Sequence, residues 1–134
     1  MSSEPYRGSF ELPASTSTVF AHLTSADLLP GWWPDGAETD PVPGGTYHLW
    51  WDGPGWHLRG EYLEVEPPSR LVYTWKWSHE KLPVRRVEMD LVIAGSGATR
   101  LEIEHDSGTD EERQGYSDGW DFFLGQLREV LARA

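Results

Sequence analysis

The C-terminal stretch of the chain carries its one long helical pattern, and this pattern limits the folds that are available. Residues 109–134 place apolar side chains on one helical face: Tyr116, Trp120, Phe123, Leu124, Leu127 and Leu131. Thr109 and Glu112 have the spacing of a capping box, which predicts that the helix begins there. A single amphipathic helix has to bury its apolar stripe against another layer. The rest of the chain must therefore supply that layer.

Strand-type alternation dominates the middle of the chain, in segments separated by turn signals. The expected strands are residues 46–51, 56–66, 70–77, 84–94 and 99–106. An earlier strand, 7–12, should be followed by two short helices, one beginning near Ser15 or Thr16 and one over 27–30. Residues 30–45 are rich in Pro and Gly, which predicts a long irregular loop. Together these elements predict one α+β domain over residues 1–134. Its curved antiparallel sheet of six to seven strands would wrap around the long C-terminal helix, with two short helices after the first strand.

The last expected hairpin can be registered from its turn. With Gly95–Gly97 at the tip, one face carries the pairs Ile93 with Thr99, Leu91 with Leu101, Met89 with Ile103, and Val87 with His105. The opposite face pairs Asp90 with Glu102 and Glu88 with Glu104, and we expect it to hold much of the negative charge. Two interpretations of that face stay open: a solvated outer surface, or a site for a cation or a basic partner.

The middle strands contain a conflict of register. Residues 71, 73, 75 and 77 alternate onto one face with Leu63 and Val65, and strict alternation would then turn His57, Arg59 and Glu61 inward. The turn at residues 52–55 instead places residues 56, 58 and 60 on the inner face. A β-bulge near Gly60 would resolve the conflict. Whether His57, Arg59 and Glu61 face the interior is left open.

Composition excludes several classes of function. The 134 residues include no Cys, which removes disulfides, thiol nucleophiles and thiolate metal sites. A net charge of −11 argues against binding to nucleic acid or to an anionic membrane surface. The five His show no metal-ligand spacing, and no cofactor-binding motif is found, so we expect neither a metal nor a cofactor. The first residues do not resemble a signal peptide and no segment is apolar enough to span a membrane, which favours the cytoplasm.

Short motifs through nearly the whole chain, each weak alone, are specific in their order and spacing. They are Leu12–Ser15 with Val19 and Phe20; Trp33; Pro43–Tyr47; Gly60 with Glu64–Pro68; Arg70–Trp75; Gly97–Leu101; His105; and Gly119–Trp120 with Leu124, Leu127 and Leu131. In these motifs the chain resembles the activator of heat-shock protein 90 ATPase homologue (Aha-type) family, of the START-like, polyketide-cyclase-like superfamily. The resemblance implies a helix-grip fold with a cavity between the sheet and the long helix. It does not imply one activity, because members include lipid or polyketide binders and cochaperone-like domains.

Eight Trp in a small acidic chain are more than a core needs, and they favour a lined cavity. The residues expected to line it are Trp33, Tyr47, Tyr73, Trp75, Trp77, Met89, Leu91, Ile103, His105, Tyr116, Trp120 and Phe123. His105 is the best polar candidate, as a ligand contact or a general base, although a histidine bonded to a core neighbour is the alternative. Three further tryptophans, Trp50, Trp51 and Trp56, could cluster at the sheet edge and form a dimer or partner surface.

The leading hypothesis is that the cavity binds a small hydrophobic, aromatic or polycyclic, molecule. The first alternative is a cyclase-, dehydratase- or hydrolase-like enzyme acting on such a ligand, for which no catalytic residue can be assigned. The second is a cochaperone-type interaction domain with a chaperone partner, which only the family resemblance suggests. A homodimer is also compatible with the sequence.

Overall fold

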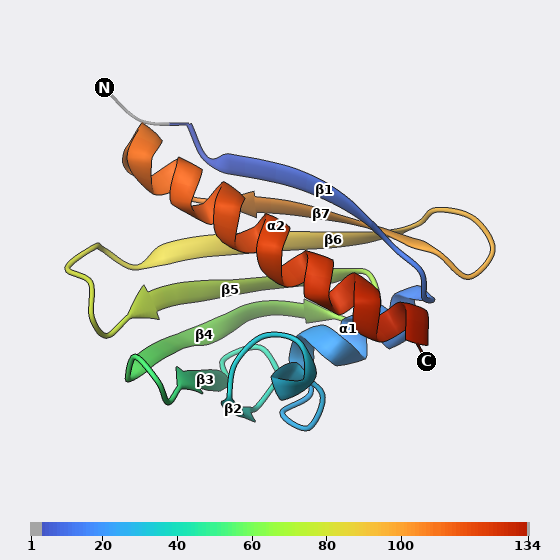
Figure 1. The fold of residues 1–134 in the computed structure, drawn as a ribbon, viewed down its shortest axis with the longest axis horizontal. Helices are drawn as coiled ribbons and strands as arrows, with labels where there is room; N and C mark the ends of the chain where they lie inside the picture. The colour runs from blue at the N-terminus through green and yellow to red at the C-terminus, as the bar shows by residue number, and fades with distance from the viewer. Residues whose placement is uncertain (1–3, 134) are drawn as a thin grey trace.

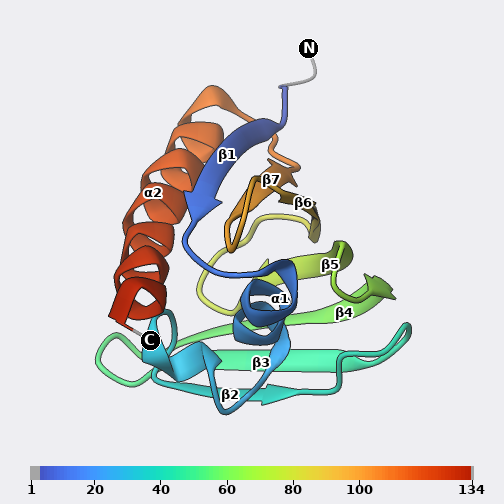
Figure 2. The same cartoon turned by 90° about the vertical axis from the view of Figure 1, so that its right-hand side faces the viewer.

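The computed structural model describes residues 4–133, which form one curved antiparallel sheet with helices on its concave face (Figures 1 and 2). In chain order the elements are β1 (Tyr6–Leu12), α1 (Thr16–Thr24), the 3₁₀ turn η1 (Leu29–Gly31), β2 (Gly36–Thr39), β3 (Thr46–Trp51), β4 (Trp56–Glu66), β5 (Arg70–Trp77), β6 (Arg85–Ile93), β7 (Thr99–His105) and α2 (Asp110–Arg133). The seven strands lie in the order β1-β7-β6-β5-β4-β3-β2. The predicted α+β helix-grip fold is confirmed.

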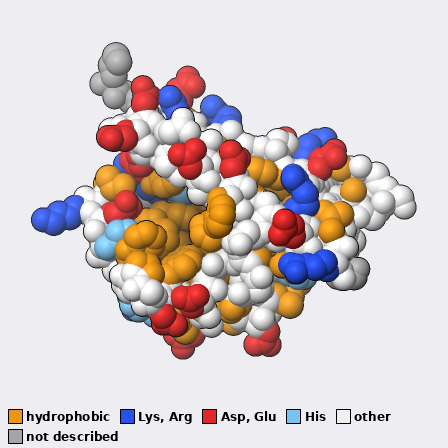
Figure 3. All heavy atoms as spheres, viewed as in Figure 1, with side chains coloured by type: hydrophobic (Ala, Val, Ile, Leu, Met, Phe, Trp, Pro, Cys, Tyr) orange, Lys and Arg blue, Asp and Glu red, His pale blue; other side chains and the backbone are white. Residues whose placement is uncertain are grey.

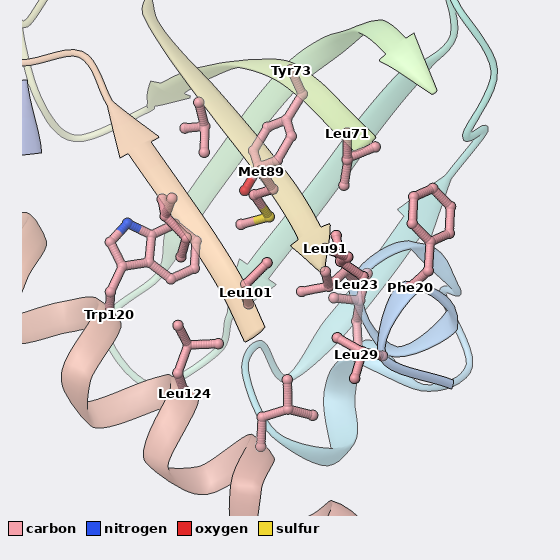
Figure 4. Packing of buried hydrophobic residues seen from close by; sticks show 14 of the residues in the cluster. Phe20, Leu23, Leu29, Leu71, Tyr73, Met89, Leu91, Leu101, Trp120 and Leu124 are labelled. Atoms are coloured by element: carbon pink, nitrogen blue, oxygen red, sulfur yellow. The ribbon is translucent and has the colours of Figure 1, made fainter. Parts of the chain in front are cut away.

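The long helix α2 crosses the sheet diagonally in Figure 1, and α1 lies at one end of the concave side in Figure 2. Both helices begin as their sequences predict. Ser15 caps α1 by accepting a hydrogen bond from the backbone N–H of Thr18, and the Thr109 hydroxyl accepts from the N–H of Glu112 at 3.0 Å. From the apolar stripe of α2, Trp120 and Leu124 point toward Leu101 and Met89 on the sheet (Figure 4).

Two expectations for the N-terminal half are corrected. Residues 30–45 are not entirely irregular, because β2 pairs there with β3 as a short edge strand. Its four residues, Gly36–Thr39, are too few to show an alternating pattern against the surrounding prolines and glycines. The second short helix is η1, a single 3₁₀ turn at Leu29–Gly31 that begins two residues later than expected.

The register predicted for the last hairpin is confirmed, from Ile93 opposite Thr99 to Val87 opposite His105. The outer face carries the expected acidic pairs, Glu88 with Glu104 and Asp90 with Glu102. Arginines from neighbouring positions compensate part of this charge. Arg70 on β5 contacts Glu64, Glu88 and Asp90 at 3.0–3.3 Å, and Arg7 on β1 contacts Glu104 at 2.9 Å. This face is therefore partly exposed to solvent and supplies some of its own counter-charges.

The expected bulge exists but lies farther along β4 than predicted. The β4–β5 register shifts between Tyr62 and Glu64, so the extra residue is Leu63 rather than a residue near Gly60. Leu63 is consequently 41% exposed instead of sharing the inner face with Val65. Gly60 is required for a different reason: a Cβ there would lie 2.0 Å from the carbonyl oxygen of Thr74. Because the shift falls after Tyr62, the residues at 58, 60 and 62 face the interior.

His57, Arg59 and Glu61, left open by the sequence, therefore lie on the outer face of β4. The Nδ1 atom of His57 lies 2.8 Å from Nε2 of His48 on β3, within hydrogen-bonding distance. Burial lowers the pKa of His48, and the positive charge of Arg59 lowers it further. These residues contribute nothing to the concave side.

Candidate functional site

A cavity of about 450 Å³ opens between the N-terminal half of α2 and the end of β5. Figure 3 shows it as a hollow lined by hydrophobic side chains, with acidic side chains around it. Its lining residues are Trp33, Trp75, Trp77, Glu80, Leu82, Thr109, Glu111, Glu112, Gly115, Tyr116, Gly119, Trp120 and Phe123. The volume falls within the range of small-molecule sites, which runs from about 300 to 1,000 Å³.

Four indoles form most of the wall, and they come from three places in the chain: the segment after η1, strand β5, which supplies two, and helix α2. Trp33 follows η1 and lies 5.8 Å from Trp75 and 5.3 Å from Trp120, measured between ring centroids. Trp77 stands at 88° to Trp75, and Trp120 is tilted 50° from it. Alternation on β5 turns residues 75 and 77 to the same side. The indoles therefore meet the cavity from several directions, and two further rings, Tyr116 and Phe123, complete the aromatic lining.

One polar cluster lies at this wall: Glu112 and Tyr116 line the cavity, and Arg85, which binds Glu112, is not among the lining residues. The Arg85 guanidinium donates to both carboxylate oxygens of Glu112, at 2.7 and 2.8 Å, and the Tyr116 hydroxyl donates to the same carboxylate at 2.5 Å. The backbone N–H of Gly108 donates a fourth hydrogen bond at 2.9 Å. The Glu112 side chain is only 6% exposed. The predicted capping box is thus half formed, because this carboxylate binds Gly108 and Arg85 instead of closing back on Thr109.

The cluster holds its protons in fixed places. Burial acts to raise the pKa of Glu112, but the hydrogen bonds from Arg85, Tyr116 and Gly108 outweigh it and hold the pKa below its ordinary value. Burial, and then the neighbouring carboxylate, raise the pKa of the Tyr116 hydroxyl far above its usual range. At neutral pH the cluster is therefore a carboxylate saturated by a guanidinium and a phenol, with no group ready to exchange a proton.

His105 lies behind the aromatic wall and is fully buried. Its ring stacks on Tyr116 at 3.6 Å between centroids, and its Nδ1 accepts a hydrogen bond from the Trp120 indole N–H at 3.1 Å. An indole N–H can only donate, so the imidazole proton lies on Nε2. Burial lowers the pKa of His105 to about 3, with the nearby Glu112 and Arg85 acting in opposite directions. His105 is accordingly a neutral histidine, bonded to a core neighbour.

Two buried nitrogen atoms, Nε2 of His105 and Nε1 of Trp75, have no hydrogen-bond partner within residues 4–133. The two rings are T-shaped at 4.6 Å between centroids. In this geometry the edge of one ring faces the π-system of the other, which offers a weak acceptor for an N–H.

Six of the twelve expected site residues are brought together in the cavity: Trp33, Trp75, Trp77, Tyr116, Trp120 and Phe123. The other six lie elsewhere. Met89, Leu91 and Ile103 are packed in the core, and His105 is closed off behind the wall. Tyr47 and Tyr73 border a separate hollow of about 20 Å³, which has room for little more than one water molecule.

The remaining tryptophans do not form the exposed cluster that the sequence suggested. Trp51 faces inward, where its N–H donates to the Trp33 carbonyl oxygen at 3.1 Å, whereas Trp50 occupies the opposite face of β3. Trp56 is 42% exposed and stacks on His79. Because neighbouring residues of a strand point to opposite faces, three tryptophans close in sequence cannot make one surface patch here.

Sequence reasoning missed the rim of the cavity, which includes the acidic residues Glu80 and Glu111 and the apolar Leu82. The loop after β5 takes its shape from Lys76, whose ammonium donates to the carbonyl oxygens of Glu80 and Leu82. No periodic pattern marks this loop. In the sequence, Glu111 is recognisable only as a residue of the first turn of the helix. The Lys76 contacts are local, but only the packing of α2 beside the end of β5 brings this loop and Glu111 to one cavity.

The described residues contain no group of three or more His, Asp or Glu side chains placed to hold a metal ion. None of the helices in residues 4–133 is both long and apolar enough to cross a membrane.

The solved structures that are similar to this chain include CalU16, DynU16 and PFC0360w. CalU16 from Micromonospora echinospora is 26% identical, with a TM-score of 0.77 over 90% of this chain and 71% of its own. DynU16, from the dynemicin biosynthetic locus, is 23% identical with a TM-score of 0.84, and the match covers 97% of this chain but only 48% of DynU16. PFC0360w, an HSP90 activator from Plasmodium falciparum, is 21% identical with a TM-score of 0.79 and covers 97% of both chains. The last two likenesses concern the fold alone.

Curated proteins gave no match to this chain. The family model of the Activator of Hsp90 ATPase homolog 1-like proteins matches residues 13–132 of the chain. The match runs from the end of β1 to the last turn of α2, and so includes every element that forms the cavity. By sequence and by fold, the chain belongs to the family of Activator of Hsp90 ATPase homolog 1-like proteins.

Proposed function

We propose that the protein binds a small, largely apolar aromatic molecule in the cavity between β5 and α2. The observation that carries the proposal is an open hollow of about 450 Å³ with six aromatic side chains in its wall. Trp75 and Trp120 are buried, whereas Trp33, Trp77, Tyr116 and Phe123 are only partly buried and leave apolar surface exposed. A flat apolar ligand stacked in the hollow would bury more of this surface.

The polar groups of the wall fit binding better than chemistry. Glu112 is saturated by Arg85, Tyr116 and Gly108, and His105 is fully buried with a pKa of about 3. An acid or base catalyst needs contact with the substrate and a pKa near the working pH. Acid or base catalysis by Glu112 or His105 would therefore require these two groups to rearrange.

A cochaperone-type role is the second candidate, and it is supported by the description of the family to which the chain belongs. Its test is a pull-down of the purified protein with Hsp90. A complex that survives washing would favour this role, and the absence of any complex would count against it.

The glycines of α2 allow a sharp test of the ligand-binding proposal. Gly119 lines the cavity, and a Cβ built there meets no atom within 4 Å, so Gly119→Phe should place a ring in the hollow without disturbing the helix. Gly125→Phe is the matched control, because that glycine has equal space but does not line the cavity. The neutral dye N-phenyl-1-naphthylamine should bind the wild type and the control, and it should lose its fluorescence enhancement with Gly119→Phe.

Equal dye binding by all three proteins would contradict the proposal, because the dye would then bind outside the cavity. Native mass spectrometry of the freshly purified protein is the companion measurement. A co-purifying small molecule that is present in the wild type and the control, but absent from Gly119→Phe, would identify the class of natural ligand.

A further inference from the structure

The rim of the cavity carries negative charge that no side chain of the wall neutralises. Three glutamates line the hollow: Glu80, Glu111 and Glu112. Glu112 is paired with Arg85, but Glu80 and Glu111 are exposed and form no side-chain hydrogen bond or ion pair within the described residues. No Lys, Arg or His is among the lining residues.

The cationic side chains nearest in the chain are occupied or lie outside the lining. The Lys76 ammonium donates hydrogen bonds to the carbonyl oxygens of Glu80 and Leu82. The Arg85 guanidinium donates to both carboxylate oxygens of Glu112. Lys81 belongs to the same exposed loop as Glu80 but does not line the cavity. The hollow therefore presents two unpaired carboxylates above a wall of aromatic rings.

Aromatic rings, like these carboxylates, attract positively charged groups. The face of an indole is the negative end of its quadrupole, and Trp is the best ring for binding a cation. Trp75, Trp77 and Trp120 meet the cavity at mutual angles of 50° and 88°, so their rings enclose a guest instead of lying flat beneath it. A net charge of −11 adds a long-range field that attracts cations and repels anions.

From these observations we infer that the ligand of this cavity is cationic: an aromatic or polycyclic molecule that carries an amine or quaternary ammonium group. The inference rests on the proposed function and narrows its ligand class. The apolar skeleton stacks against the indoles, and the ammonium group lies among the ring faces below Glu80 and Glu111. Neutral molecules of the same shape lose the electrostatic part of this interaction, and anions are repelled.

A set of probes with one shape and three charges tests the inference. The cation is N,N,N-trimethyl-2-naphthylammonium, its neutral counterpart is 2-tert-butylnaphthalene, and the anion is 2-naphthalenesulfonate. Quenching of Trp fluorescence should give a Kd for the cation about tenfold or more below that of the neutral probe. The anion should bind weakest. Added NaCl should weaken binding of the cation and leave the neutral probe unaffected.

Paired variants locate the charge that is responsible. Glu80→Gln with Glu111→Gln should bring the Kd of the cation close to that of the neutral probe, without changing the Kd of the neutral probe. Glu11→Gln with Glu129→Gln removes the same charge from exposed positions outside the cavity, and it should keep most of the preference for the cation.

The outcomes separate the inference from the function on which it rests. Neutral binding as tight as that of the cation, or a preference that survives in the Glu80 and Glu111 variant, would overturn the cationic ligand while the aromatic site stands. Failure of both the neutral and the cationic probe to bind would overturn both proposals.

Discussion

The Arg85–Glu112 pair joins the start of β6 to the first turn of α2, and Glu112→Gln tests how much it contributes. The substitution keeps the shape of the side chain but removes its charge. Arg85, only 13% exposed, donates to both carboxylate oxygens, and in the variant one of these two acceptors becomes an amide NH2, which is itself a donor. Breaking a buried pair from one side costs about 3–5 kcal/mol. Some solvent reaches this pair, so we expect the free energy of unfolding to fall by about 3 kcal/mol.

Urea unfolding at pH 7 measures this loss. With a urea dependence of about 2 kcal/mol per M, the midpoint should fall by about 1.5 M. Glu111→Gln is the matched control, since Glu111 is the exposed neighbour of Glu112 and should change stability by less than about 0.5 kcal/mol. Replacing both partners, with Arg85→Met and Glu112→Leu, should cost less than Glu112→Gln alone, because no charge is then left unpaired.

The dependence on pH gives a second, independent check. The folded-state pKa of Glu112 is lowered, so its contribution is complete above the unfolded-state value of about 4.3 and is lost as the pH falls through the folded-state pKa. The difference between wild type and Glu112→Gln should therefore be largest at neutral pH and shrink in acid. A difference that is absent at pH 7, or that stays the same in acid, would refute this account of the cluster.

Three further changes should affect stability through named contacts. Gly60→Ala would place a Cβ 2.0 Å from the Thr74 carbonyl oxygen and should lower the free energy of unfolding, measured by thermal unfolding, by more than about 2 kcal/mol. Its control, Gly125→Ala, lies in open space on α2 and should raise that free energy by about 1 kcal/mol. Equal effects of the two substitutions would refute the argument. Arg70→Met removes the cation that contacts three carboxylates, and urea unfolding should show a loss of about 1–2 kcal/mol in the free energy of unfolding. The loss should be smaller in high salt, and a loss that salt does not change would argue against this electrostatic role. Ser15→Ala removes the cap of α1 and should lower stability by about 1 kcal/mol, which calorimetry can detect; an unchanged Tm would show that the cap contributes nothing.

The parts of the fold that local rules determine could be predicted from the sequence. A turn between Gly95 and Gly97 determines the pairing of every residue in the hairpin around it, which is why the register down to His105 is correct. The bulge was harder to place. Conflicting alternation shows that one extra residue is needed in β4, but backbone packing decides which residue is displaced, and that residue is Leu63.

The candidate site could be predicted only in its aromatic half. Trp75, Trp77 and Trp120 lie on strand and helix faces that periodicity reveals, and all three line the cavity. Glu112 reads in the sequence as a helix cap, and its pairing with Arg85, 27 positions away, has no local signal. Tyr73 shares the inward face of β5 with the tryptophans but is packed against Tyr47 and Tyr62 instead. Periodicity identifies the face on which a side chain lies, but the position of the helix decides where that face is left open.

The contacts of Trp33 have a spectroscopic consequence. Its ring lies within 6.0 Å of the rings of Trp32, Trp51, Trp75 and Trp120, measured between centroids. Transition dipoles at such separations couple, so these indoles absorb as an exciton system and should give a strong couplet in the far-ultraviolet circular dichroism spectrum. The couplet depends on the relative orientation of the rings. The circular dichroism of these tryptophans should therefore report changes in the geometry of the cavity wall without an attached label.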